Sequence, residues 1–168
     1  WVISKGSAKK ITVKYEVYAF ELSVRTSFLD LTHGYVSGTG VFMFANKHTD
    51  SKGKLTIIPH ESFSKITTAL PKAGESVASD GTQYFEYANY DQLVDCPIEI
   101  GNQVEFHFQA AGVDHTVGVY GPGNYEVEKL KVDMAKIVEA ATGVFGENPN
   151  KNYTFIIHNV VDGQGGLE

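Results

Sequence analysis

The sequence is poor in cysteine and in positive charge, and it lacks a long apolar run. Cys96 is the only cysteine among 168 residues, so an internal disulfide and a cysteine-rich zinc site are both excluded. The net charge is −6 and no basic cluster occurs, which argues against a surface for nucleic acid or for an anionic membrane. No apolar stretch is long enough to cross a bilayer.

The chain does contain enough apolar side chains for a real core. Hydrophobic residues make up 42% of it, which suits one ordinary domain or two small ones. We interpret Cys96 as a small core hydrophobe rather than a nucleophile, because no histidine lies near it in the sequence. A single cysteine does not fix the compartment, although a periplasmic or secreted location is slightly favoured over a cytoplasmic one.

Residues 1–101 carry the signals of short antiparallel strands. Residues 11–17 alternate apolar and polar side chains, and the alternation resumes out of phase at residues 20–24, which predicts a bulge near Ala19. Polar, glycine-bearing connections separate three further apolar runs, at residues 35–45, 55–58 and 84–87. This part is predicted to form an antiparallel, β-sandwich-like domain.

The pattern changes after residue 101 and predicts β-β-α-β. Residues 104–108 and 115–120 flank a turn at Ala111-Gly112, and residues 125–145 carry a one-sided apolar stripe at helical spacing. Asn124 is the expected N-cap of that helix and Gly146 its expected end. The near-continuous apolar run at residues 153–158 predicts a buried strand. The fold class is therefore mainly β with one long helix.

The histidines and carboxylates give no metal-binding pattern. None of the six histidines is paired at i, i+4, and His60-Glu61 begins an H-E-x-x-H motif that fails at Ser64. His107 and His115 flank the predicted hairpin turn, and ordinary strand positions explain them better than ligation does. We therefore expect no metal ligand in this chain.

Three further features have both a chemical and a structural interpretation. Asp91 and Asp95 are spaced for acid–base work or calcium, but turn and capping chemistry is commoner. The glycines of residues 121–124 and 163–166 match no phosphate-binding motif. The closing Gly165-Gly166-Leu167-Glu168 is either a loose terminus or a turn that lets another backbone approach closely.

Five stretches are distinctive when taken together. They are, in order along nearly the whole chain, YEVYAFELSVRTSFLD, TAL, YDQLVDCPIEIGN, HTVGVYGPGNY and GGLE. Together they resemble the glycyl aminopeptidase family of gluzincin zinc metallopeptidases, metallopeptidase family sixty-one. The resemblance implies that residues 1–101 are the later part of an N-terminal β domain. Residues 102–168 would then be the first part of a thermolysin-like catalytic domain, which in this family is often followed by a PDZ domain.

The resemblance also implies a function, namely zinc-dependent removal of small N-terminal residues such as glycine or alanine from peptides. Gly165, Gly166, Leu167 and Glu168 would form the substrate-binding strand, with Glu168 accepting hydrogen bonds from the α-ammonium group of the peptide. The zinc motif and its downstream glutamate would lie beyond Glu168. This piece alone is therefore expected to bind no zinc, to hold no catalytic residue and to be inactive, and His158 is assigned to packing.

Two non-catalytic alternatives stay open at this point. Nine tyrosines and ten phenylalanines suit a β-sandwich module that binds a glycan or a protein. An inactive peptidase relative used for protein interaction is the other alternative. Self-association through the surface that the rest of a catalytic domain would cover is a further expectation.

Overall fold

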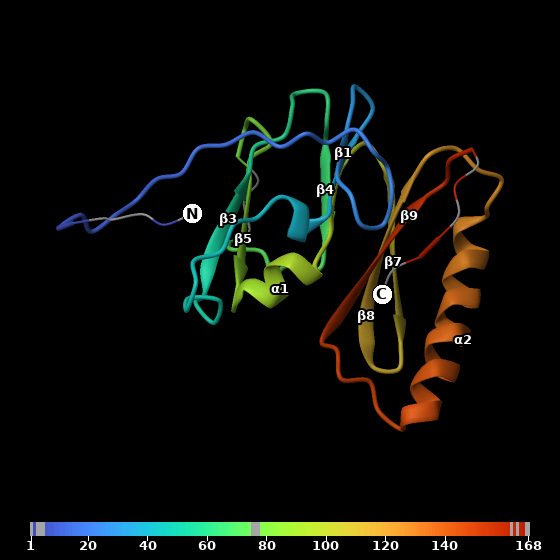
Figure 1. The fold of residues 1–168 in the computed structure, drawn as a ribbon. Helices are drawn as coiled ribbons and strands as arrows, with labels where there is room; N and C mark the ends of the chain where they lie inside the picture. Colours follow the sequence, from blue (N-terminus) through green and yellow to red (C-terminus); the bar gives the residue numbers. More distant parts are fainter. Residues whose placement is uncertain (1, 3–5, 75–77, 162, 164, 167–168) are drawn as a thin grey trace.

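The computed structural model describes residues 2, 6–74, 78–161, 163 and 165–166. Its N-terminal part contains six strands and two short helical segments (Figure 1). The strands are β1 (Phe28–Leu29), β2 (Gly34–Val36), β3 (Gly53–Ile57), β4 (Lys65–Thr68), β5 (Gln83–Tyr87) and β6 (Ile98–Gly101). The helical segments are a 3₁₀ turn (Gly38–Gly40) and α1 (Tyr90–Asp95).

These strands form two antiparallel sheets around one core. The larger sheet has the order β1-β2-β6-β4, and β3 pairs with β5 in the smaller one. Ile66, Leu70, Phe85, Leu93 and Ile98 are buried together between them and α1. Cys96 packs at the margin of this core, as its interpretation as a hydrophobe predicts.

The C-terminal part follows the expected β-β-α-β order. It consists of β7 (Val104–Ala110), β8 (Val113–Tyr120), α2 (Val127–Phe145) and β9 (Asn152–His158). The β7–β8 turn holds Ala111 and Gly112 at φ values of 50° and 73°, the left-handed geometry that a two-residue hairpin requires. A crossover through α2 then places β9 parallel to β8, which gives the sheet order β7-β8-β9.

The two faces of the β7-β8-β9 sheet have different chemistry, because side chains alternate along each strand. Phe106, Val117 and Val119 are buried on one face against Leu130 and Met134 of α2. Figure 1 shows α2 lying along this side of the sheet. The opposite face turns toward the β1-β2-β6-β4 sheet, where a β-carbon on Gly118 would lie 3.0 Å from Thr67 Cγ2. Glycine at position 118 thus lets the two sheets approach closely.

The fold class predicted from the sequence is confirmed, but several local predictions are wrong. Residues 11–17 form no strand, and Ile11, Val13, Tyr15 and Val17 are 39–47% exposed. None of the described strands pairs with this segment, so the bulge predicted near Ala19 has no ladder to interrupt. The chain joins a sheet just after this segment, where the Ala19 backbone oxygen accepts from the Leu29 N–H and Phe20 bridges to Phe28.

The ends of the long helix and the burial of the last strand also differ from prediction. The helix starts after Glu126 rather than at Asn124, without a side-chain cap, while Gly146 ends it in the left-handed conformation at φ 85°. The apolar stripe is only half covered, since Ile137 and Val144 are 67% and 78% exposed. β9 is half-buried rather than buried. None of the described helices is long and apolar enough to span a membrane.

Candidate functional site

Glu99 is a carboxylate at the centre of the larger sheet, and it is fully buried. It lies on β6 between two isoleucines that face the core, so strand alternation turns its side chain to the other face of the sheet. On that face the register places it directly between Tyr35 of β2 and Thr67 of β4. This is the face that meets the C-terminal sheet.

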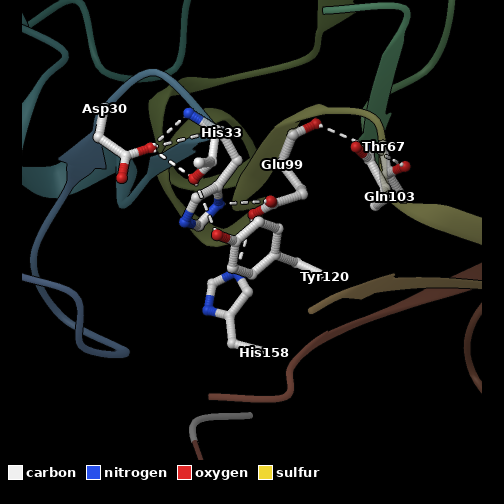
Figure 2. A network of polar contacts seen from close by, with 8 residues as sticks. Asp30, His33, Thr67, Glu99, Gln103, Tyr120 and His158 are labelled. Carbon is white, nitrogen blue, oxygen red and sulfur yellow. Dashed lines mark hydrogen bonds and ion pairs between the residues drawn. The ribbon is translucent and has the colours of Figure 1, made fainter. Parts of the chain in front are cut away.

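Two imidazoles compensate the buried carboxylate, one for each oxygen (Figure 2). His33 Nδ1 lies 2.7 Å from Glu99 Oε1, and His158 Nε2 lies 2.7 Å from Glu99 Oε2. His33 belongs to the β1–β2 turn and is 1% exposed, whereas the side chain of His158, at the end of β9, is 17% exposed. Glu99 thus joins the N-terminal part of the chain to the C-terminal part.

The β1–β2 turn is built to present His33. The carboxylate of Asp30 accepts hydrogen bonds from the backbone N–H groups of Thr32 and His33 and from the Thr32 hydroxyl. These bonds, with that of the Thr32 side chain the strongest, lower the pKa of Asp30 below its ordinary value. The Thr32 hydroxyl also lies 2.8 Å from the Tyr120 hydroxyl, which fixes the turn against β8.

Tyr120 and His158 reach the site from the C-terminal sheet. The parallel register of β8 and β9 pairs these two residues, so both side chains emerge on the same face. The Tyr120 ring stacks on His33 with a centroid distance of 3.5 Å and an interplanar angle of 14°. Tyr35 meets His158 edge-on at 4.9 Å. Both imidazoles are therefore held in orientation by an aromatic neighbour.

A second polar network continues from Glu99 along the sheet interface. The side chain of Gln103 donates to the Thr67 hydroxyl at 2.8 Å, and that hydroxyl donates to Glu105 Oε2 at 2.6 Å. The same Gln103 amide lies 3.4 Å from the backbone oxygen of Glu99. The meeting face of the two sheets is thus polar and hydrogen-bonded rather than apolar.

The Glu99 carboxylate influences the pKa of Tyr35, its neighbour in the sheet. Burial raises the pKa of Tyr35, and the Glu99 carboxylate beside it raises that pKa further.

The two imidazole nitrogens of His33 and His158 and one carboxylate oxygen of Glu99 can do one of two things here. They can bridge the sheets by hydrogen bonds, or they can ligate a metal, since their three donor atoms lie within 4.8 Å of one another.

An open groove of about 420 Å³ borders this cluster. Its walls are β9, the segment around Val94 and Pro97, and the closing glycines. Tyr35 and His158 also line it, so His158 is the member of the cluster that faces the groove. Of the predicted substrate strand, Gly165 and Gly166 lie at this groove, whereas Leu167 and Glu168 are outside the described residues.

The other sequence candidates have structural explanations. Cys96 is half-buried, and burial raises the pKa of its thiol to about 11, which disfavours a nucleophilic thiolate. His107 pairs with Thr116 and His115 with Phe108, so these histidines point to opposite faces of the hairpin.

The remaining two candidates lie in turn and helix structure. Asp91 and Asp95 belong to α1, a helix that the sequence did not predict, and Asn89 caps its start. The imidazole of His60 lies 2.9 Å from the Ser62 hydroxyl in a turn, not on a helix face.

The spacing of residues in the sequence does not reveal the cluster, because its members are far apart along the chain. His33 and His158 are 66 and 59 positions from Glu99. One signal was present, namely a glutamate between Ile98 and Ile100 in a strand that is otherwise apolar. A charged side chain in such a place must find a partner when it is buried.

Comparison with known proteins gives one family and a set of structures. The model of the peptidase M61 N-terminal domain matches residues 1–102. Among 18 matching solved chains is an aminopeptidase N family protein from Idiomarina loihiensis, with a TM-score of 0.80 and 32% identity. That match covers 90% of this chain, which spans only 26% of the other protein. No curated protein matches the sequence.

The family match takes in the whole β1-β2-β6-β4 sheet and includes both His33 and Glu99. The similarity of structure extends further, over most of the chain. The chain therefore belongs to the peptidase M61 family, whose N-terminal domain it carries over residues 1–102.

Proposed function

We propose that this chain supplies the β domain and the first catalytic-domain elements of a zinc-dependent aminopeptidase. The observation that carries the proposal is the groove of about 420 Å³ between β9 and the N-terminal part, with Gly165 and Gly166 at its border. Family membership supports a peptidase. In this proposal the groove is where the N-terminal end of a peptide substrate binds.

The β9 strand offers a backbone edge to that groove. Among the described strands β9 pairs with β8 alone, and residues of β9 line the groove, where an extended segment would add to the sheet as a further strand. Gly165 has a φ of 138°, and a β-carbon there or at Gly166 would meet no atom within 4 Å. Glycine at both positions leaves room for an extended backbone to approach closely.

Glu168 is proposed to select peptides with a free N-terminus. Its carboxylate would accept charge-assisted hydrogen bonds from the α-ammonium group, which an N-acetylated peptide lacks. Small first residues, such as glycine or alanine, would suit the site. This role places Glu168 in binding rather than in the chemical step.

The proposed zinc-dependent peptide hydrolysis needs an H-E-x-x-H motif, which these 168 residues do not contain. His60-Glu61 cannot substitute for it because it lies in a turn. When bound in the longer protein, zinc would supply a water of lowered pKa and polarise the scissile carbonyl. The proposed contribution of these 168 residues is to bind and orient the peptide, without hydrolysis of their own.

The test measures hydrolysis of alanyl and glycyl substrates by the longer protein that carries this chain. Glu168→Ala should lower kcat/KM for substrates with a free N-terminus by roughly 10- to 100-fold, the value of one hydrogen bond to a charged group. The matched control is Glu147→Ala, because Glu147 is exposed beyond the end of α2.

Two results would contradict the proposal. Unchanged kcat/KM in Glu168→Ala would remove the role of Glu168. A longer protein without H-E-x-x-H and a downstream glutamate would instead be an inactive relative, and the groove would then serve binding alone.

A further inference from the structure

We propose that His33, Glu99 and His158 form a binding site for one divalent transition-metal ion, with zinc the best match. This goes against the expectation, drawn from sequence spacing, that the chain has no metal ligand. The three side chains come from the β1–β2 turn, from β6 and from the end of β9. An ion held by all three would tie the N-terminal part of the chain to the C-terminal sheet.

The donor set selects the kind of ion. Two imidazole nitrogens with one carboxylate oxygen suit zinc and its neighbours in the first transition row. Calcium and magnesium prefer sites made of oxygen atoms alone and are disfavoured here. No thiolate is near enough to matter, because Cys96, the only cysteine, is not part of the cluster.

The distances are close to those that a tetrahedral ion needs. Bonds of about 2.0–2.1 Å to zinc place neighbouring ligand atoms roughly 3.3 Å apart. In the structure each imidazole nitrogen is 2.7 Å from its Glu99 oxygen, and the three donor atoms lie within 4.8 Å of one another. The two imidazoles contact different oxygens of Glu99, so a single ligating oxygen needs two adjustments. Its 2.7 Å contact opens by roughly 0.6 Å, and the wider spacings, at most 4.8 Å, close toward roughly 3.3 Å as the ion replaces the bridging protons.

The surroundings hold two ligands firmly and leave the third adjustable. His33 is fixed by the stacked Tyr120 ring and by the bond from its backbone N–H to Asp30. Glu99 is fixed by the sheet ladder on both sides. His158 lies at the end of a strand with part of its side chain exposed, so a small rotation of this ring closes the site.

The groove supplies an entry path and the fourth ligand. His158 and Tyr35 line it, so an ion enters at His158, and rotation of that partly exposed ring gives access to the buried Glu99. Among the described residues the cluster contains three ligating side chains, and a water from the groove completes four-coordination. Figure 2 shows the imidazoles of His33 and His158 converging on the Glu99 carboxylate, with the Tyr120 ring stacked on His33.

The experiment titrates zinc into the chelator-stripped 168-residue protein and follows heat by calorimetry. We expect one zinc per chain and a higher melting temperature in its presence. Cobalt added in place of zinc should give the visible absorption of a four-coordinate site with nitrogen ligands. Because the readout is metal bound to this chain, it is independent of the proposed peptidase function.

Substitutions of the cluster residues test whether zinc binds at His33, Glu99 and His158. Glu99→Gln and His158→Ala should each weaken zinc binding at least tenfold, whereas His60→Ala, which removes an exposed histidine outside the cluster, should leave it unchanged. Circular dichroism without zinc checks that each variant is folded. His158→Ala is the safer variant, because His158 is the ligand at the rim.

Three outcomes would overturn the proposal. They are no stoichiometric zinc in the wild-type protein, a cobalt spectrum without nitrogen ligation, and zinc affinity equal to wild type in both cluster variants. Each would leave His33, Glu99 and His158 as a hydrogen-bonded bridge between the sheets.

Discussion

Replacing Glu99 by alanine should be among the most destabilising single changes in this protein. The carboxylate is fully buried and engaged by an imidazole on each oxygen at 2.7 Å. Its removal leaves the His33 nitrogen buried without its partner, whereas His158 can turn toward the groove. Breaking a buried pair by removing one partner costs about 3–5 kcal/mol, and we expect that loss in the free energy of unfolding.

The assay is urea unfolding in chelator-containing buffer, followed by circular dichroism. The control is Glu86→Ala, since Glu86 and Lys54 form a 4.0 Å ion pair with both side chains largely exposed. An exposed pair of this kind contributes at most about 1 kcal/mol. His158→Ala should fall between the two variants, because water can replace its hydrogen bond at the rim.

A double-mutant cycle separates the bridge from the loss of two side chains. If Glu99 stabilises the interface through His158, the double variant should be less destabilised than the two single variants together, by about 0.5–3 kcal/mol. Strict additivity, or a Glu99→Ala loss no larger than that of Glu86→Ala, would refute the reasoning.

The remaining predictions concern a glycine and the cysteine. Gly121→Ala should lower the free energy of unfolding several times more than Gly146→Ala does. Both have φ near 90°, but a β-carbon at Gly121 would overlap the Asn159 carbonyl oxygen, whereas at Gly146 it meets nothing. The left-handed backbone alone costs roughly 1–2 kcal/mol, so equal losses of unfolding free energy would contradict the close approach. Cys96 should react slowly with iodoacetamide at pH 8, since its thiol pKa is raised to about 11, and 6 M guanidinium should restore ordinary reactivity. Equally fast alkylation before and after unfolding would show that burial does not suppress the thiolate.

Local periodicity predicted the C-terminal part well. The β7–β8 hairpin, the single long helix ending at Gly146, and the strand after it were all predicted, because hairpin turns and helix stripes are set by residues near one another in sequence. The same logic failed for residues 11–17, where alternation occurs without a partner strand. It also missed α1, whose six residues are too few to show a period.

The sequence by itself determined a mainly β chain with one long helix and its membership of a peptidase family. Tertiary structure decided the cluster. β4 approaches β8 closely at Gly118, and Tyr120 and His158 share the face of the C-terminal sheet that turns toward Glu99. This packing brings His33 and His158 to Glu99, although they are 66 and 59 positions from it in the sequence. The physical reason is that Glu99 is stable in its strand only where two imidazoles reach it, and strand order, not spacing, puts them there.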